Sequence, residues 1–131
     1  MIQDEGRFSD AQQVEMAFYT AFRTCDLQLM QQVWAHDDVL CIHPGSACIV
    51  GHAAILRSWQ HILSDAQLPQ IDFTVQQRFT TDTLAVHVVE EHIDNSARVL
   101  ATNIYRYEHK GWLMVEHHAS LWQGGEAHTL Q

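Results

Sequence analysis

The chain has 131 residues, of which 47% are hydrophobic and 18% charged. That is enough for one domain with a real core and too little for two, so we expect residues 1–131 to form a single domain with an ordered core at about 8–123. The 7 Lys and Arg against 16 Asp and Glu give a net charge of -9, and the basic residues form no run or stripe. This argues against nucleic acid and against membrane surfaces as partners. No apolar stretch approaches the roughly 18 residues of a membrane span, and we expect a cytoplasmic protein.

The cysteines and histidines give no metal signature. The three cysteines are an odd number without CxxC spacing, which indicates reduced and mostly buried thiols. One of them, Cys48, has an alternative role as a nucleophile with His43 as its base. Ten histidines include no HxxxH pair on a predicted helix, so neither a metal nor another cofactor is expected. The alternative is a metal site assembled in space from His43, Glu90 and His118.

Two helices are predicted near the N-terminus. Ser9 and Gln12 are typical of a capping box, and the apolar residues that follow at helical spacing predict a helix over about 10–23. Asp26 can cap a second, shorter helix whose apolar face ends at Trp34.

A short strand and a third helix are predicted next. Val39–Ile42 is β-prone and stops at Pro44-Gly45, a turn-forming pair. Gly51 then begins a helix with apolar residues at helical spacing as far as Leu63.

Four longer strands complete the chain. The first, from Ile71 to Thr80, alternates apolar and polar residues, as in a sheet with one wet face. The next three are predicted at 84–93, 98–108 and 112–122, with hairpin turns at 94–96 and 109–111. Helices followed by an antiparallel meander predict an α+β fold in which the helices cover one face of a bent sheet.

The segment from Val33 to Trp59, VWAHDDVLCIHPGSACIVGHAAILRSW, resembles the nuclear-transport-factor-2-like superfamily, in particular its SnoaL-like and ketosteroid-isomerase-like members. The resemblance lies in the helix that ends in a tryptophan, the Asp37-Asp38 pair, the strand that is followed by Pro44-Gly45, and the glycine before the next helix. It implies a cone-shaped, cystatin-like α+β fold, with three N-terminal helices packed on a curved, mostly antiparallel sheet around a pocket. This superfold hosts isomerases, cyclases, dehydratases, hydrolases and domains that only bind or assemble.

In the isomerase pattern, an Asp-Pro pair after the first strand supplies the base. His43-Pro44 is the matching pair, which implies that His43 is the acid or base; imidazole titrates near neutrality with little tuning. The alternative is that His43 only caps backbone groups of its turn. The oxyanion-polarising tyrosine of that pattern corresponds to Phe18, which has no hydroxyl. Tyr19 is about 100° further around the helix and is expected to point elsewhere, which argues against steroid isomerisation.

The last two strands, ATNIYRYEHKGWLMVEHHAS, resemble relatives that include the association domain of calcium/calmodulin-dependent kinase II. In that relative a polar pocket residue lies nine positions before the tryptophan, and here Asn103 holds this position. Strand parity then predicts that Asn103 and His118 face one cavity, below Phe18 and Trp59, provided that no bulge interrupts the last strand. Glu116 and Ser120 share the parity of His118.

Glu90 and Glu91 fall on opposite faces of the second long strand. The resemblance matches Glu90, eight residues after Asp82, to a polar pocket position, and His92 shares its side. One β-bulge would exchange the two sets. Phe18, Trp34 and Trp59 are candidate aromatic contacts to a ligand, although tryptophans more often fill the core.

Two functions remain open from the sequence. The first is a cofactor-free acid–base enzyme of isomerase, dehydratase or cyclase type, acting on a small hydrophobic carbonyl or hydroxyl compound, with His43, Glu90 and His118 as catalytic residues. The second is a ligand-binding or assembly domain of the same shape without chemistry. A homodimer is expected through the outer sheet face, formed by residues of one parity on the last strand: Leu113, Val115, Ala119 and Leu121.

Overall fold

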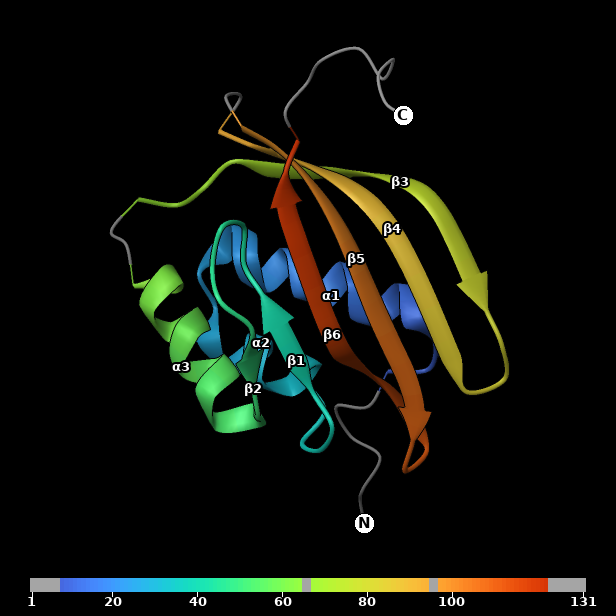
Figure 1. Ribbon diagram of the computed structural model, residues 1–131. Coiled ribbons are helices and arrows are strands. Elements are labelled where there is room, and N and C mark those ends of the chain that lie inside the picture. Colours follow the sequence, from blue (N-terminus) through green and yellow to red (C-terminus); the bar gives the residue numbers. More distant parts are fainter. Residues whose placement is uncertain (1–7, 65–66, 95–96, 123–131) are drawn as a thin grey trace.

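The computed structural model describes residues 8–64, 67–94 and 97–122 (Figure 1). The expected turn residues Asn95 and Ser96, the expected core end at Gln123 and the residues on either side of the expected core lie outside these ranges. The elements in chain order are α1 (Ala11–Thr24), α2 (Leu27–Val33), β1 (Leu40–Ile42), β2 (Ile49–Val50), α3 (His52–Leu63), β3 (Ile71–Thr80), β4 (Leu84–Ile93), β5 (Ala97–Glu108) and β6 (Gly111–Leu121). The predicted α+β order of helices before a long meander is confirmed, and β2 is an addition to it.

The two N-terminal helices begin at aspartates. Asp10 caps α1 by accepting a hydrogen bond from the backbone N–H of Gln13 at 2.8 Å, so the predicted cap at Ser9 is one residue too early. Asp26 caps α2, as predicted, through the N–H of Leu29 at 3.0 Å. Side-chain caps of this kind satisfy donors that the first helical turn leaves unpaired.

A turn and two short strands connect α2 to α3. The predicted turn at Pro44-Gly45 is present, with Gly45 at a φ of 75° and the N–H of Ser46 donating to the carbonyl of His43 at 2.9 Å. Gly51 then begins α3 as its N-cap with a φ of 101°, a conformation that favours glycine.

The six strands form one curved sheet in the order β2-β1-β6-β5-β4-β3, and the helices cover its concave face (Figure 1). All neighbouring strands pair antiparallel except β1 and β6, which are parallel. The hairpin between β5 and β6 turns at His109 and Lys110, both with positive φ, as a two-residue turn requires. The core lies between α1, α3 and the inner face of the long strands, so side chains of β4 to β6 alternate between this core and the outer face.

Two β-bulges break that alternation. In β3, Val75 pairs with Val89 and Gln77 with Val88, so Gln76 is an extra residue. In β6, Glu116 pairs with Ile104 and Met114 with Tyr105, so Val115 is an extra residue. Because an extra residue moves the following side chains to the other face, sequence parity counted across either bulge gives the wrong side.

None of the helices in the described ranges is long and apolar enough to cross a membrane. The cellular compartment stays a prediction.

Candidate functional site

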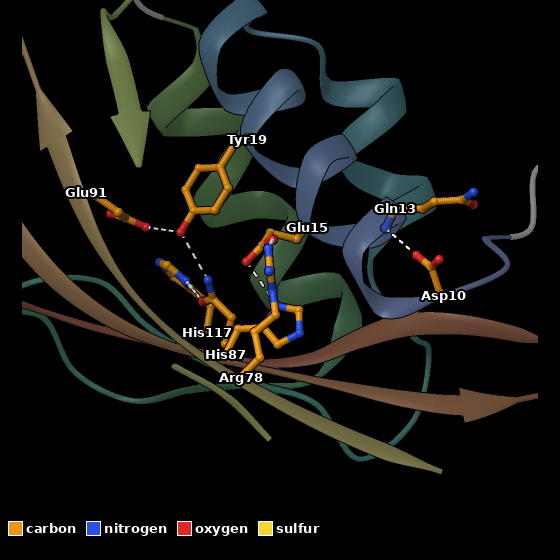
Figure 2. A network of polar contacts seen from close by, with 9 residues as sticks. Asp10, Gln13, Glu15, Tyr19, Arg78, His87, Glu91 and His117 are labelled. Atoms are coloured by element: carbon orange, nitrogen blue, oxygen red, sulfur yellow. Dashed lines mark hydrogen bonds and ion pairs between the residues drawn. The ribbon is translucent and has the colours of Figure 1, made fainter. Parts of the chain in front are cut away.

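Four polar side chains form one hydrogen-bonded chain between α1 and the inner face of the sheet (Figure 2). The Tyr19 hydroxyl on α1 lies 2.5 Å from Glu91 Oε2 on β4 and 3.0 Å from Asn103 Nδ2 on β5. Asn103 Oδ1 in turn lies 2.6 Å from His117 Nδ1 on β6. We call these four residues the buried polar row, since none of them is more than 2% exposed.

The row has one consistent direction of hydrogen bonding. Asn103 donates through its amide nitrogen to Tyr19, so its oxygen is the acceptor for His117 and the imidazole carries its proton on Nδ1. The Tyr19 hydroxyl then donates to the Glu91 carboxylate. Every bond therefore points from His117 toward Glu91, which is the acceptor at the end.

Glu91 is poised to exchange a proton near neutral pH. Burial raises its pKa from 4.5 to about 7, although the hydrogen bond from Tyr19 acts in the opposite direction. Burial and the neighbouring Glu91 carboxylate also raise the pKa of Tyr19, so its hydroxyl stays protonated. Phe73, opposite Glu91 on β3, stacks on the Tyr19 ring with centroids 4.3 Å apart and covers this end of the row.

His117 is a neutral residue over the same pH range. Burial lowers its pKa from 6.5 to about 3, and the nearby His43 and His118 act in the same direction. It therefore donates a fixed hydrogen bond to Asn103 and does not exchange protons at neutral pH.

His43 extends the row toward the first strand. Its ring is half-buried, packs edge-on against Trp59 at 4.9 Å and lies 6.2 Å from the His117 ring. Its Nε2 is 3.0 Å from the hydroxyl of Ser58, which donates its own proton to the carbonyl of Ile55. His43 must then donate through Nε2–H, which leaves Nδ1 as the basic nitrogen. Burial lowers the pKa of this imidazole.

The cysteine beside His43 is Cys41, with its Sγ 3.6 Å from Nε2. Burial raises the pKa of Cys41 to about 12, so it remains a thiol at neutral pH. Cys48, the alternative nucleophile, lies exposed between the His43 turn and β2.

A second polar cluster lies one helical turn before Tyr19. Glu15 Oε2 is 2.9 Å from His87 Nδ1, and its Oε1 is 2.7 Å from an Arg78 guanidinium nitrogen (Figure 2). Burial would raise the pKa of Glu15, but the hydrogen bonds from His87 and Arg78 outweigh it and the pKa is lowered. Arg78 reaches this position because the bulge at Gln76 turns it inward. Glu15 and Tyr19 together anchor α1 to β4, through His87 and Glu91.

Comparison with known proteins assigns the family. A family model described as a SnoaL-like domain matches residues 12–123. The chain belongs to the SnoaL-like family. The F-box protein SKIP8 from Arabidopsis thaliana is 31% identical to it over 112 residues, which are 82% of this chain and 48% of that protein. The chain thus spans about half the length of this curated relative.

Solved structures share the SnoaL-like fold. A protein from Thiobacillus denitrificans, provisionally assigned as a calcium/calmodulin-dependent protein kinase type II association domain, is 35% identical with a TM-score of 0.84, covering 89% of this chain and 98% of that one. A provisionally assigned dehydratase of the NTF2-like family from Streptomyces avermitilis is 26% identical with a TM-score of 0.77, covering 86% and 94%. A ketosteroid isomerase-like protein from Erwinia carotovora atroseptica, at 15% identity and a TM-score of 0.69 over 86% and 94%, shows the fold alone. The predicted superfamily and fold are confirmed.

In this SnoaL-like domain the last strand does not have the predicted orientation. Asn103 faces the interior as predicted, but its partner is His117, and His118 is exposed on the outer face. The prediction required an uninterrupted strand, and the bulge at Val115 reverses the parity beyond it. Glu116 and Ser120 share the outer face with His118, so their placement in the pocket is also wrong.

The preference for Glu90 over the adjacent Glu91 is also wrong, although β4 pairs with β5 without a bulge. Glu91 lies inside, whereas Glu90 lies on the outer face, where it pairs with Arg98 at 2.5 Å and lies 3.6 Å from His92. Glu90, His92 and His118 are therefore outside the interior and cannot act there. The alternative metal site of His43, Glu90 and His118 fails too, because His43 points inward; within the described ranges no group of three His, Cys, Asp or Glu side chains is placed to hold a metal ion.

The predicted aromatic residues lie inside the domain. Phe18 packs on Trp59 at 5.4 Å and on His117 at 5.0 Å, beside the buried polar row. Trp34 is also buried, but it bridges to Met114 on β6. Whether Phe18, Trp34 or Trp59 contacts a ligand stays a prediction.

Sequence reasoning did not select Tyr19 or His117, and it preferred Glu90 to Glu91. The signal for Tyr19 was its spacing from Glu15: two polar residues one turn apart, next to the apolar stripe of α1, both face the sheet. In the same way His87 and Glu91 share strand parity with the apolar Val89, which is fully buried.

Proposed function

We propose that this SnoaL-like domain binds a small hydrophobic carbonyl or hydroxyl compound and moves a proton on it without a cofactor, as in isomerisation, dehydration or cyclisation. The Glu91–Tyr19 pair carries this proposal. A carboxyl with a pKa of about 7 is half-protonated at neutral pH, the condition in which a group both gives and takes protons readily. The similarity to a provisionally assigned dehydratase supports the same class of chemistry.

His43 is the second acid–base group in this proposal. Its Nδ1 is the unprotonated nitrogen, and its lowered pKa keeps the ring in the neutral, basic form at pH 7. A base of this kind takes a proton from a carbon beside a carbonyl and returns it at another position. Asn103 orients Tyr19, whose hydroxyl donates to one oxygen of Glu91, and protonated Glu91 polarises the substrate oxygen through its other oxygen.

A ligand-binding or assembly domain is the second candidate function. It is favoured by the closure of the buried polar row on itself: each of its four side chains bonds a neighbour in the row, and none is more than 2% exposed. The similarity to a provisionally assigned kinase association domain supports this alternative. The two functions differ in whether a bound compound exchanges protons with the protein.

Proton exchange on a simple ketone tests the first function. The wild-type protein is expected to accelerate deuterium incorporation beside the carbonyl of 1-indanone in D2O, followed by NMR. His43→Ala is expected to lower the accelerated rate by roughly a hundredfold, the usual contribution of a positioned acid or base. His43→Asp is expected to retain part of the rate, since a carboxylate restores a base. His118→Ala, on the outer face, is the matched control and is expected to leave the rate unchanged.

Each outcome decides between the two functions. Binding of 1-indanone by calorimetry without any acceleration of exchange favours the binding domain. Equal losses in His43→Ala and His118→Ala contradict the assignment of His43, provided that circular dichroism shows both variants folded.

We also propose that the domain forms a homodimer through the outer face of its sheet. Of the residues predicted for this contact, Val115 and Ala119 are buried, whereas Leu113 is half-buried and Leu121 is 55% exposed, so β6 supplies only part of an apolar face. In addition, Phe79, Val86 and Ile104 lie opposite one another across β3, β4 and β5, and Phe79 is 57% exposed. A symmetric partner is the usual cover for such a face.

Sedimentation tests the dimer. The wild type is expected to sediment as a dimer at micromolar concentration, and Ile104→Glu as a monomer, because the new carboxylate would be buried without a partner. Gln60→Glu on the exposed side of α3 is the control and is expected to remain dimeric. A monomeric wild type contradicts the proposal.

A further inference from the structure

The closed interior raises the question of how a compound reaches the buried polar row. A pocket of about 250 Å³ lies where the C-terminal end of α1, the end of α3 and the segment leading into β3 meet. Its apolar walls come from all three: Phe22, Ile62, Leu63 and Pro69. Its volume is below the roughly 300 to 1,000 Å³ of sites for drug-sized ligands, so its occupant is small.

The pocket is suited to a neutral molecule. Among the described residues of its lining Asp94 is the one with a charge, and its carboxylate accepts a hydrogen bond from the backbone N–H of Gln70 at 2.9 Å. A carboxylate at the rim repels anions, whereas it accepts a hydrogen bond from a hydroxyl group. The apolar side chains of the walls, together with Gln67 and Asp94 in the same lining, favour a small neutral compound that carries a hydroxyl.

Phe22 lies between this pocket and the interior. It follows Tyr19 by three residues on α1, and its ring packs against Trp59 at 5.2 Å and Phe18 at 6.4 Å. Trp59 contacts His43 on its other side at 4.9 Å. Phe22 therefore separates the pocket from Phe18 and Trp59. These two rings in turn contact His117 and His43.

We propose that this pocket is the outer chamber of the ligand site, that it binds a small neutral alcohol, and that Phe22 limits how large a compound it accepts. The link to the interior rests on the proposed function. Occupation of the chamber itself requires no chemistry, so it can be measured separately from turnover.

Two cysteines provide the measurement within one molecule. Cys25 lines the pocket and is partly exposed, whereas Cys48 is exposed away from it and Cys41 is buried. The probe is 2-naphthol, and the readout is the rate of alkylation of each thiol by iodoacetamide, followed by mass spectrometry. At ten times its Kd, 2-naphthol is expected to slow alkylation of Cys25 about tenfold and to leave Cys48 unchanged. The anion 2-naphthoate is expected to protect neither thiol.

Variants of the walls test the rest of the proposal. Ile62→Trp fills the pocket and is expected to abolish protection of Cys25 by 2-naphthol. Phe22→Ala is expected to let the larger 2-anthrol protect Cys25, which it does not do in the wild type; Phe22→Leu is the smaller change, to be used if the alanine variant does not fold.

Several results would overturn the proposal. These are unchanged alkylation of Cys25 with 2-naphthol, equal protection by 2-naphthoate, full protection in Ile62→Trp, and no gain with 2-anthrol in a folded Phe22 variant. Protection of Cys25 without proton exchange on 1-indanone would support the proposed binding pocket and contradict the proposed enzyme activity. Proton exchange without protection of Cys25 would support the enzyme activity and contradict the binding pocket.

Discussion

Glu91→Gln is expected to gain stability over the wild type as pH rises. The free energy of unfolding of the variant minus that of the wild type is expected to be about 3 kcal/mol larger at pH 8 than at pH 4. The folded-state pKa of Glu91 is about 7, against 4.5 for an unperturbed carboxyl. Between these values the folded state binds the proton and the unfolded state releases it, so the free energy of unfolding falls as pH rises. The difference of pKa corresponds to about 3 kcal/mol, as an order of magnitude.

The stabilising contribution of the neutral Glu91 is complete below pH 4.5 and lost as pH rises through about 7. Gln keeps the acceptor that Tyr19 uses and has no charge to bury. Urea unfolding at a series of pH values, analysed as wild type minus variant, isolates this one group from the others. The matched control is Glu90→Gln on the outer face, for which we expect a difference within about 0.5 kcal/mol at every pH. A difference between wild type and Glu91→Gln that does not change with pH would contradict the raised pKa.

Much of the fold could be predicted from the sequence, because helices and strands have different hydrophobic periods. The bounds of β4 match the prediction, and the helix beginning at Gly51 and the hairpin at His109 and Lys110 were also predicted correctly. The resemblance predicted that the His43 side chain points inward, whereas its contact with Ser58 could not be predicted from the sequence. Local patterns are sufficient for elements, since each pattern repeats over several residues.

The site was predicted less well, because one extra residue in a strand reverses the face of the sheet to which the following side chains point. Val115 is apolar and buried, and nothing in its chemistry distinguishes a bulge from a regular strand position. The interior residue therefore changes from His118 to His117 without any change in composition. Gln76 has the same effect for Arg78, which turns from the predicted wet face to Glu15.

Tyr19 was missed for a different reason. Helix geometry places it about 100° from Phe18, which correctly separates the two side chains. The prediction assumed that only one side of α1 is buried. The structure covers this helix on two sides, because Phe18 packs on Trp59 of α3 and Tyr19 hydrogen-bonds to Glu91 of β4. A helix enclosed by both a helix and a curved sheet buries a wider arc than one apolar stripe indicates.

In the wild type, His117 is expected to lower the free energy of unfolding by an amount on the order of 5 kcal/mol as the pH falls from 6.5 toward 3. His117→Gln is expected to lack this loss. The pKa of His117 is lowered to about 3, against 6.5 for an unperturbed imidazole. Between these values the unfolded state binds a proton that the folded state does not, so the free energy of unfolding rises with pH. The contribution is complete above pH 6.5 and lost as pH falls toward 3. Since Gln also donates to an acceptor such as Asn103 and does not titrate, the variant lacks this loss.

His118→Gln provides the control that the bulge makes possible. The two histidines are adjacent, yet His117 is 2% exposed and His118 lies on the outer face, so only the first is expected to change the acid limb of a urea-unfolding series. For His118→Gln we expect a stability within about 0.5 kcal/mol of the wild type at each pH. An acid effect in His118→Gln and none in His117→Gln would mean that β6 pairs without its bulge. Asn103 would then face His118 across the sheet interior, and the parity first predicted from the sequence would be the correct one.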